Sequence, residues 1–167
     1  MLDWAVEQNE HPVAIRIPVG PLHETGVADT TDYSILNKNQ VTQKGSKVSL
    51  FGLGNFYGLA KEVAKELADK HGITATLVNP KFITGLDEEL LDSLESEHQV
   101  CGDFWKMASL KVAMVRWLQA ILEIQTSRFK ITVLKKPYHD RYNAKKLLAE
   151  NGVTVDNIVK NILASLA

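Results

Sequence analysis

Three closely spaced glycines form the first candidate site for chemistry. Gly52, Gly54 and Gly58 follow a short apolar run and lead into a helical pattern. A strand that passes through a glycine-rich turn into a helix can bind phosphate on its backbone N–H groups. The spacing is GxGxxxG, whereas the dinucleotide fingerprint is GxGxxG, and no lysine follows as in a P-loop. Asn79 and Lys81 lie where a ribose-binding acidic residue is expected. We therefore favour a tight turn over dinucleotide binding.

Arg16 is the second candidate. It lies near the end of Val13–Ile17, an apolar run that is strand-like and is followed by Pro18 and Gly20. Ligands of α/β folds bind at strand ends, and a guanidinium there can hold a phosphate or carboxylate bidentately. An edge-strand arginine that faces solvent is an equally good interpretation.

The other reactive residue types form no recognisable site. The histidines at positions 11, 23, 71, 98 and 139 lack metal spacings such as HxxxH or HExxH. His139, Asp140 and Arg141 form a polar cluster before a helix, which is typical of capping and surface charge. Cys101 has no nucleophile context and is interpreted as a small core residue. These residues do not make a self-sufficient active site.

Composition narrows the class of protein. The 167 residues carry a net charge of −1 without a basic patch, which argues against nucleic-acid binding. A single cysteine excludes an intramolecular disulfide framework and suits a reducing compartment, so we expect a cytoplasmic protein. The start is acidic and unlike a secretory signal, and no run of about 20 apolar residues could span a membrane.

The elements around the glycines form one βαβ unit. A strand at 48–51 precedes a helix whose apolar face carries Leu59, Val63 and Leu67, and Gly72 is a plausible C-cap. A second strand, Ile73–Val78, follows, so we expect parallel strands joined by a right-handed crossover.

The rest of the chain also alternates strands and helices, which predicts an α/β layered domain. Residues 21–46 have few apolar anchors and are interpreted as a linker. The remaining predicted elements are helices at Leu2–Gln8, Glu88–Ser96 (capped by Asp87), 105–125, Asn143–Glu150 and Val155–Leu166 (capped by Thr154), and a strand at Phe129–Leu134.

Several stretches together resemble the thiamine-diphosphate-dependent transketolase family, with the closest similarity to its 1-deoxy-D-xylulose-5-phosphate synthases. VAIRIPVG is similar to the end of the family's pyrimidine-binding domain. KVSLFGLGNFYGLAKEVAKEL and ITATLVNPKFITGLDEELL are similar to the first strands and helices of its C-terminal domain, and YHDRYNAKKLLAENGVTVDNIVKNI to its closing helices. Val19 replaces a basic residue, and Gly85 stands where proline is usual.

The resemblance implies a fold and a division of the chain. The fold is α/β, a three-layer domain with a mixed, mainly parallel sheet of about five strands flanked by helices. Residues 1–20 are the last helix and strand of the pyrimidine-binding domain, 21–46 a linker, and 47–167 the C-terminal domain. Arg16 matches the arginine that contacts the substrate phosphate, and no other functional residue carries over.

The resemblance also implies a function. The parent enzymes are transferases of isoprenoid precursor biosynthesis that use thiamine diphosphate and Mg²⁺, held between domains that this chain largely lacks. The chain alone is expected to bind no cofactor and to be an inactive fragment. The alternative is a stand-alone assembly module that docks on separately encoded cofactor-binding subunits. The expected partners are a second copy, as a homodimer, or the missing enzyme domains.

Residues of about 101–134 depart from the family pattern of a strand ending in Glu-Asp-Gly, followed by Gly-Gly-Tyr/Phe-Gly. Reading two bases late, the codons of Trp105 and Lys106 force Glu, and those of Met107 and Ala108 force Gly. We hypothesise two compensating frameshifts, near residues 101 and 134, which the coding DNA would reveal. A genuine divergent helix over Lys106–Gln125 is the alternative.

Overall fold

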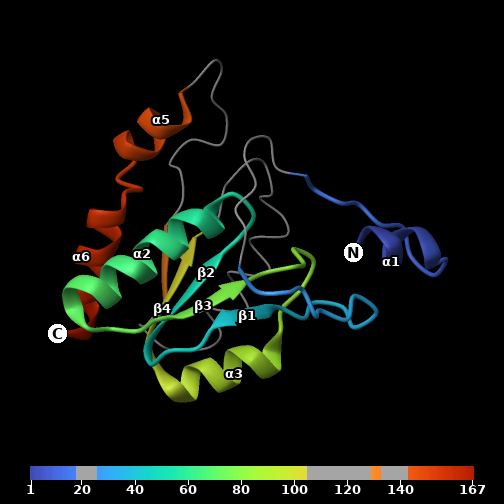
Figure 1. The fold of residues 1–167 in the computed structure, drawn as a ribbon, viewed down its shortest axis with the longest axis horizontal. Helices are drawn as coiled ribbons and strands as arrows, with labels where there is room; N and C mark the ends of the chain where they lie inside the picture. Colours follow the sequence, from blue (N-terminus) through green and yellow to red (C-terminus); the bar gives the residue numbers. More distant parts are fainter. Residues whose placement is uncertain (18–25, 105–128, 133–142) are drawn as a thin grey trace.

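The computed structural model describes residues 1–17, 26–104, 129–132 and 143–167 (Figure 1). Its sheet has five strands in the order β1-β3-β2-β4-β5. The strands are β1 (Gln40–Gln43), β2 (Lys47–Gly52), β3 (Thr76–Asn79), β4 (His98–Phe104) and β5 (Phe129–Thr132). β1 is antiparallel to β3, and every other pair is parallel. The mixed, mainly parallel sheet of about five strands is thus confirmed.

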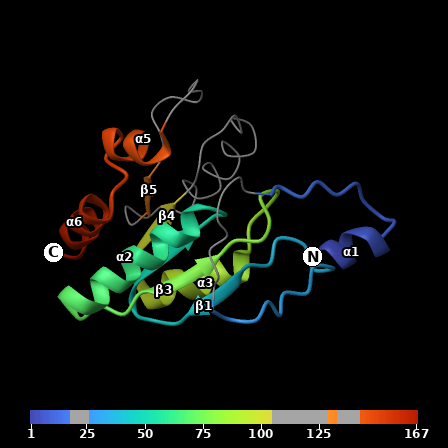
Figure 2. The same cartoon turned by 45° about the horizontal axis from the view of Figure 1, so that its top comes forward.

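Helices cover both faces of this sheet (Figures 1 and 2). α2 (Phe56–His71), α5 (Ala144–Glu150) and α6 (Val155–Leu166) supply the larger core cluster, against Val48 and Leu50 of β2. α3 (Glu88–Glu97) covers the other face, where Phe51 and Val78 meet its leucines. Successive side chains of a strand point to opposite faces, so β2 supplies both cores.

The βαβ unit of β2, α2 and β3 follows its sequence pattern closely. Val63 and Leu67 of α2 are fully buried, as are the neighbouring alanines at 60 and 64, so the predicted apolar face lies on the sheet. Gly72 ends α2 in the left-handed region with φ of 64°, and its N–H donates to the Ala68 carbonyl. Glycine takes this conformation without a Cβ clash.

Three helix starts are capped, and the caps at Asp87 and Thr154 were predicted. The side-chain oxygens of Asp87, Asn143 and Thr154 accept hydrogen bonds from the backbone N–H three residues further on in α3, α5 and α6. Each cap satisfies a donor that the helix itself cannot pair.

Some predicted elements differ from the structure. Helix α1 (Leu2–Glu7) forms as expected, but Val13–Ile17 is in no strand, since it pairs with no other strand of the described residues. β1 lies within the predicted linker 21–46, and β4 was not predicted. β5 confirms the first part of the strand expected at Phe129–Leu134. The helix expected at 105–125, with most of the proposed frameshifted segment, lies outside the described residues.

Candidate functional site

The glycine turn lies at the carboxyl end of β2. Gly54 has a φ of 56°, and a Cβ on Gly52 would lie 2.6 Å from the Cα of Tyr57. The N–H groups of Phe56 and Tyr57 donate to the carbonyls of Leu53 and Gly54, at 3.1 and 3.0 Å. Two amides at the start of α2 are therefore engaged within the turn and do not point to a bound phosphate. This geometry supports a tight turn between strand and helix.

Arg16 lies on the extended segment that follows α1. Its side chain is exposed, and no ion pair joins it to another of the described residues. The segment belongs to no sheet, so Arg16 does not lie at the end of a paired strand. The described residues thus leave its guanidinium open to an external anion without forming a pocket around it.

Lys81, which follows β3, binds the segment that precedes β1. Its Nζ lies 3.0 Å from Asp29 Oδ2, and the hydroxyl of Tyr33 donates to the same carboxylate oxygen. Burial by itself raises the pKa of Asp29, but hydrogen bonds from Tyr33, Thr31 and Lys81 outweigh it and hold that pKa well below its usual range. Burial and the Asp29 carboxylate raise the pKa of Tyr33 well above its usual range. Asp29, Tyr33 and Lys81 thus form a charged cluster that joins the segment before β1 to the end of β3.

The carboxylate of Asp87 binds the segment that precedes β1 at a second point, Lys38 and Asn39, directly before the strand. Asp87 Oδ1 lies 3.2 Å from Lys38 Nζ, and Asp87 Oδ2 accepts a hydrogen bond from the N–H of Asn39 at 2.9 Å. The Asp87 side chain is 4% exposed, and it also caps α3. Lys38 in turn bridges to the exposed carboxylate of Glu89. Asp87 is therefore engaged in packing the chain and is not available as a catalytic acid or base.

A small recess lies between these two contacts. It encloses about 10 Å³, enough for about one water molecule and far below the volume of a cofactor pocket. Its lining residues are Asn39, Phe51, Pro80, Phe82, Gly85, Leu86, Asp87 and Leu91. The recess is a packing feature at the carboxyl ends of β2 and β3.

His98, at the start of β4, is buried. Its Nε2 lies 2.7 Å from Thr76 Oγ1, and its Nδ1 lies 3.0 Å from the Leu94 carbonyl oxygen. The N–H of Gly45 donates to Thr76 Oγ1, at 2.9 Å. If the imidazole carries its proton on Nδ1, it donates to the Leu94 carbonyl, and Nε2 accepts from the Thr76 hydroxyl. The Thr76 oxygen in turn accepts from the N–H of Gly45, so every one of these groups has a hydrogen-bond partner. His98 therefore joins β3, β4 and α3, and both of its nitrogens are occupied.

The described residues do not fit thiamine diphosphate with its magnesium ion. No group of three or more His, Cys, Asp or Glu side chains that could hold a metal occurs among them. Mg²⁺ bound to a diphosphate needs carboxylate or carbonyl oxygens of the protein. In the glycine turn, the N–H groups of Phe56 and Tyr57 already donate to carbonyls of the turn itself. No reaction step through the cofactor can be derived from these residues.

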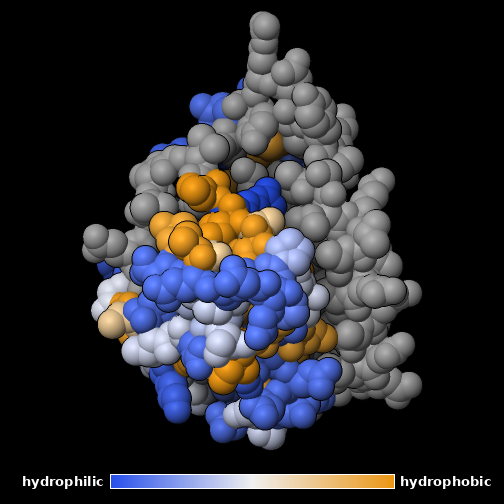
Figure 3. Space-filling view, turned by 90° about the vertical axis from the view of Figure 1, so that its right-hand side faces the viewer, coloured by the Kyte–Doolittle hydropathy of each residue, from blue (hydrophilic) through white to orange (hydrophobic). Residues whose placement is uncertain are grey.

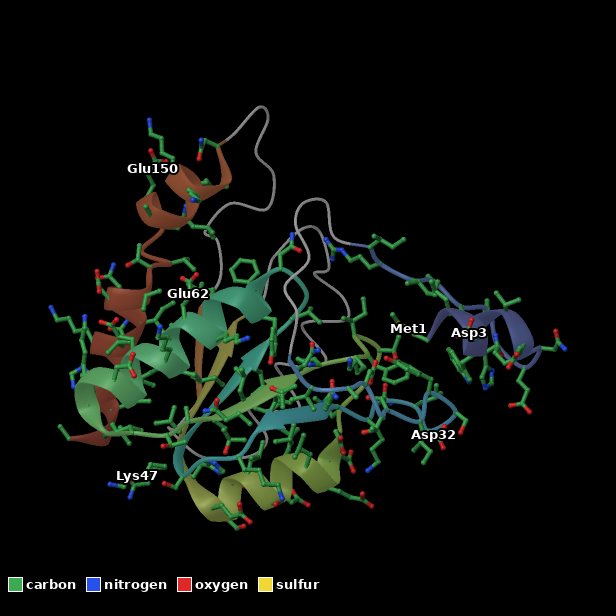
Figure 4. All side chains as sticks on the ribbon, in the orientation of Figure 1. Met1, Asp3, Asp32, Lys47, Glu62 and Glu150 are labelled. Carbon is green, nitrogen blue, oxygen red and sulfur yellow. The ribbon has the colours of Figure 1, made fainter. Side chains whose placement is uncertain are left out.

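Among the described residues, whose side chains Figure 4 draws, no hydrogen bond or ion pair joins Arg16 to the glycine turn or to a histidine. Arg16 lies on the N-terminal segment, the glycine turn lies at the end of β2, and His71 ends α2. His23 and the cluster His139–Arg141 lie outside the described residues, as does the side chain of Cys101. Sequence reasoning missed the pairing of Thr76 with His98, because residues 22 positions apart share no local pattern. No described helix is long and apolar enough to cross a bilayer.

Comparison with protein families shows that the chain resembles a known domain family. The profile of the transketolase C-terminal domain matches residues 37–158, which is more than half of the chain. A 1-deoxy-D-xylulose-5-phosphate synthase from Alkaliphilus oremlandii is 27% identical over 97% of this chain but only 26% of its own length. One from Symbiobacterium thermophilum is 35% identical over 50% of this chain and 13% of its own length. The chain thus spans about a quarter, or less, of these relatives.

Solved structures share the fold. A split-gene transketolase, described as an inactive β4 tetramer, superposes with a TM-score of 0.66 and 19% identity over 84% of this chain and 46% of its own. A transketolase from Campylobacter jejuni gives a TM-score of 0.51 with 16% identity over 86% of this chain and 20% of its own. At such identities the likeness concerns the fold alone.

Proposed function

The chain belongs to the transketolase C-terminal domain family, and on that premise we propose that it is the C-terminal part of a 1-deoxy-D-xylulose-5-phosphate synthase-like enzyme, inactive by itself. The observation that carries the proposal is the alignment with the Alkaliphilus enzyme, which uses nearly all of this chain and about a quarter of the relative. The whole enzyme would join pyruvate to glyceraldehyde 3-phosphate, in the cytoplasm.

In this proposal residues 1–20 are the end of the pyrimidine-binding domain, 21–46 a linker and 47–167 the C-terminal domain, with β1 placed before that boundary. Arg16 binds the phosphate of the acceptor substrate. Its exposure and its fixed charge suit that role, because a guanidinium can hold a phosphate bidentately. An Arg16→Ala change in the assembled enzyme would raise KM for the phosphorylated aldehyde and leave KM for pyruvate unchanged.

The test is an assay of the purified chain. With pyruvate, glyceraldehyde 3-phosphate, thiamine diphosphate and Mg²⁺, the chain alone is expected to release no carbon dioxide and form no sugar phosphate. Adding a polypeptide that carries the diphosphate-binding and pyrimidine-binding domains of a relative tests for restored turnover. Turnover by the unaccompanied chain would refute the proposal.

A second candidate function is that of an assembly module on separately encoded cofactor-binding subunits. The similarity to a split-gene transketolase favours it, since the gene of that enzyme is split and its β4 tetramer is inactive. A neighbouring gene that encodes the two missing domains, and whose product binds the chain and turns over substrate with it, would support this function. In either case the chain alone associates with a second copy as a homodimer.

A further inference from the structure

The turn between α5 and α6 contains the one Asn-Gly pair of the sequence, Asn151–Gly152. Asparagine deamidates most readily before glycine, because a residue without a Cβ leaves its backbone nitrogen unhindered. The Gly152 nitrogen attacks the side-chain carbon Cγ of Asn151 and expels ammonia, which closes a five-membered succinimide ring. A water molecule then opens the ring to aspartate or isoaspartate. The sequence thus carries the chemistry for a spontaneous modification at this turn.

The backbone of Asn151 opposes ring closure in the folded chain. The ring requires the Gly152 nitrogen to lie on the same side of the Cα–C bond as Cβ. Asn151 has a ψ of 5°, which places the Gly152 nitrogen beside the amide nitrogen of Asn151 and away from Cβ. The Asn151 side chain is also held, since its Nδ2 donates to the Leu147 carbonyl at 2.8 Å. A rotation about Cα–C must therefore precede the reaction.

The hydrogen bonds that keep this conformation accept at carbonyls of α5. The N–H of Gly152 donates to the Ala149 carbonyl at 3.0 Å, and the N–H of Val153 donates to the Leu148 carbonyl at 2.8 Å. The Leu147 carbonyl holds the asparagine side chain. All three acceptors lie on one short helix, so the turn loses these contacts together when α5 opens.

α5 opens at a low cost in free energy. A helix of seven residues is too short to be stable by itself. Among the α5 residues whose burial the structure describes, only Leu147 is buried, and segments with few buried apolar contacts open locally. Glu150, beside the turn, and Met1 lie on opposite sides of the molecule (Figure 4). An association that covered the apolar side chains gathered on the α1 side (Figure 3) would leave α5 free to open.

We propose that Asn151–Gly152 is a deamidation site gated by α5, so that the closed turn protects Asn151 and the open turn exposes it to modification. The products do not restore the turn. Aspartate lacks the donor to Leu147 and adds negative charge beside Glu150 at the C-terminal end of α5, where the helix dipole is unfavourable to it. Isoaspartate lengthens the backbone by a CH₂ group. Modification therefore makes the opening of α5 irreversible, whatever reaction the whole enzyme catalyses.

The first experiment measures the rate at which residue 151 becomes aspartate or isoaspartate in mildly alkaline buffer, by peptide mapping with mass spectrometry. In concentrated urea, which opens the turn, Asn151 is expected to react faster than any other asparagine of the chain. In native buffer its rate is expected to be about tenfold lower or less, since only the open fraction reacts. Another asparagine that reacts faster in urea, or equal rates at Asn151 in the two buffers, would overturn the proposal.

Variants of the α5 cap test the gate. Asn143 accepts a hydrogen bond from the N–H of Lys146, so Asn143→Ala removes the cap of α5 and should raise the native rate about fivefold. Asn143→Ser keeps a capping oxygen and is the matched control, with an unchanged rate. Asp87→Ala removes the cap of α3 and should also leave the rate unchanged. No change with Asn143→Ala, or an equal rise with Asp87→Ala, would exclude α5 as the gate.

Hydrogen exchange of the unaltered chain provides a test that does not depend on the folding of a variant. The amides of Gly152 and Val153 are expected to be protected about tenfold less, or weaker still, than those of Val63 and Leu67 in α2, because α5 opens without the core. Equal protection of the two pairs would mean that the turn opens only when the whole domain unfolds, and the gate at α5 would then be refuted.

Discussion

Asp87 Oδ2 accepts a hydrogen bond from the backbone N–H of Asn39 at 2.9 Å, although the two residues lie 48 positions apart. The same carboxylate caps α3 through the N–H of Leu90 and pairs with Lys38. One side chain thus fixes the start of a helix on one face of the sheet and the approach of the chain to edge strand β1. The segment before β1 is part of the folded domain because of this contact.

Replacing Asp87 with alanine is expected to lower the free energy of unfolding by about 2 kcal/mol, because it removes a helix cap and leaves the N–H of Asn39 without its partner. Urea denaturation measures the change. Glu89→Ala is the matched control, since Glu89 pairs with the same lysine but is 87% exposed, and it should have little effect. Equal losses in the two variants would contradict this account.

Tyr33→Phe tests the hydrogen bond to Asp29 while keeping the ring contacts with Trp4 and Phe82. We expect a loss of about 1 kcal/mol near neutral pH, kept small because the Asp29 side chain is 40% exposed. The folded-state pKa of Asp29 is lowered, so its contribution is complete above the ordinary pKa of about 4 and is lost as the pH falls below it. The difference between the two proteins should therefore shrink in acid.

Alkaline pH should also reduce the difference in stability between the unaltered protein and the Tyr33→Phe variant. The folded-state pKa of Tyr33 is raised, so the stability it contributes is complete below the ordinary tyrosine pKa of about 10 and declines as the pH rises above it. Tyr57→Phe is the control in acid, because the Tyr57 hydroxyl donates to Thr42 Oγ1 and not to a carboxylate. A Tyr33→Phe difference that stays constant from pH 2 to pH 7 would exclude the role given to Asp29.

Thr76→Val should destabilise the protein by about 2 kcal/mol, because it leaves His98 Nε2 and the N–H of Gly45 without a shared partner. Thr42→Val is the comparison, since Thr42 is less buried and lies on the edge strand. Thermal unfolding of the two variants measures the difference. Similar Tm values would show that the buried hydroxyl adds nothing beyond its packing.

Local sequence patterns predicted most of the helices and strands of the fold. The four-residue spacing of Val63 and Leu67 predicted the buried face of α2, and Asp87 and Thr154 marked the starts of α3 and α6 correctly. β1 was not predicted because its sequence, QVTQ, is short and polar. It forms a strand because it pairs with β3. Val13–Ile17 shows the reverse case, in which strand propensity finds no partner among the described residues.

The candidate sites were harder to predict than the fold. The glycine spacing argued against a nucleotide fingerprint, and only the structure shows that the amides of Phe56 and Tyr57 are engaged within the turn. The Asp29–Lys81 pair joins residues 52 positions apart, and no spacing rule connects them. The role of Arg16 depends on groups that the described residues do not include, so it remains a proposal.

Nucleotides should not stabilise the protein. A ligand that binds the folded state raises Tm, whereas in the turn after β2 the N–H groups of Phe56 and Tyr57 already donate within the turn. NAD and ATP at millimolar concentration are therefore expected to leave the thermal transition unchanged, with a magnesium-only sample as the control. A reproducible rise with either nucleotide would reopen the phosphate-binding interpretation of the three glycines.

The two glycines of this turn should differ in what they tolerate. A Cβ on Gly52 would meet the Cα of Tyr57 at 2.6 Å, so Gly52→Ala must push α2 away from β2 and is expected to destabilise by roughly 2–3 kcal/mol. At Gly54 a Cβ meets nothing within 4 Å, and only the φ of 56° opposes it, so Gly54→Ala should lose about 1 kcal/mol. Gly54→Asn should lose less, because asparagine tolerates the left-handed region. Chemical denaturation of the three variants tests the order, and a Gly54→Ala loss that equalled that of Gly52→Ala would show that backbone conformation, rather than the approach of α2 to β2, makes glycine necessary here.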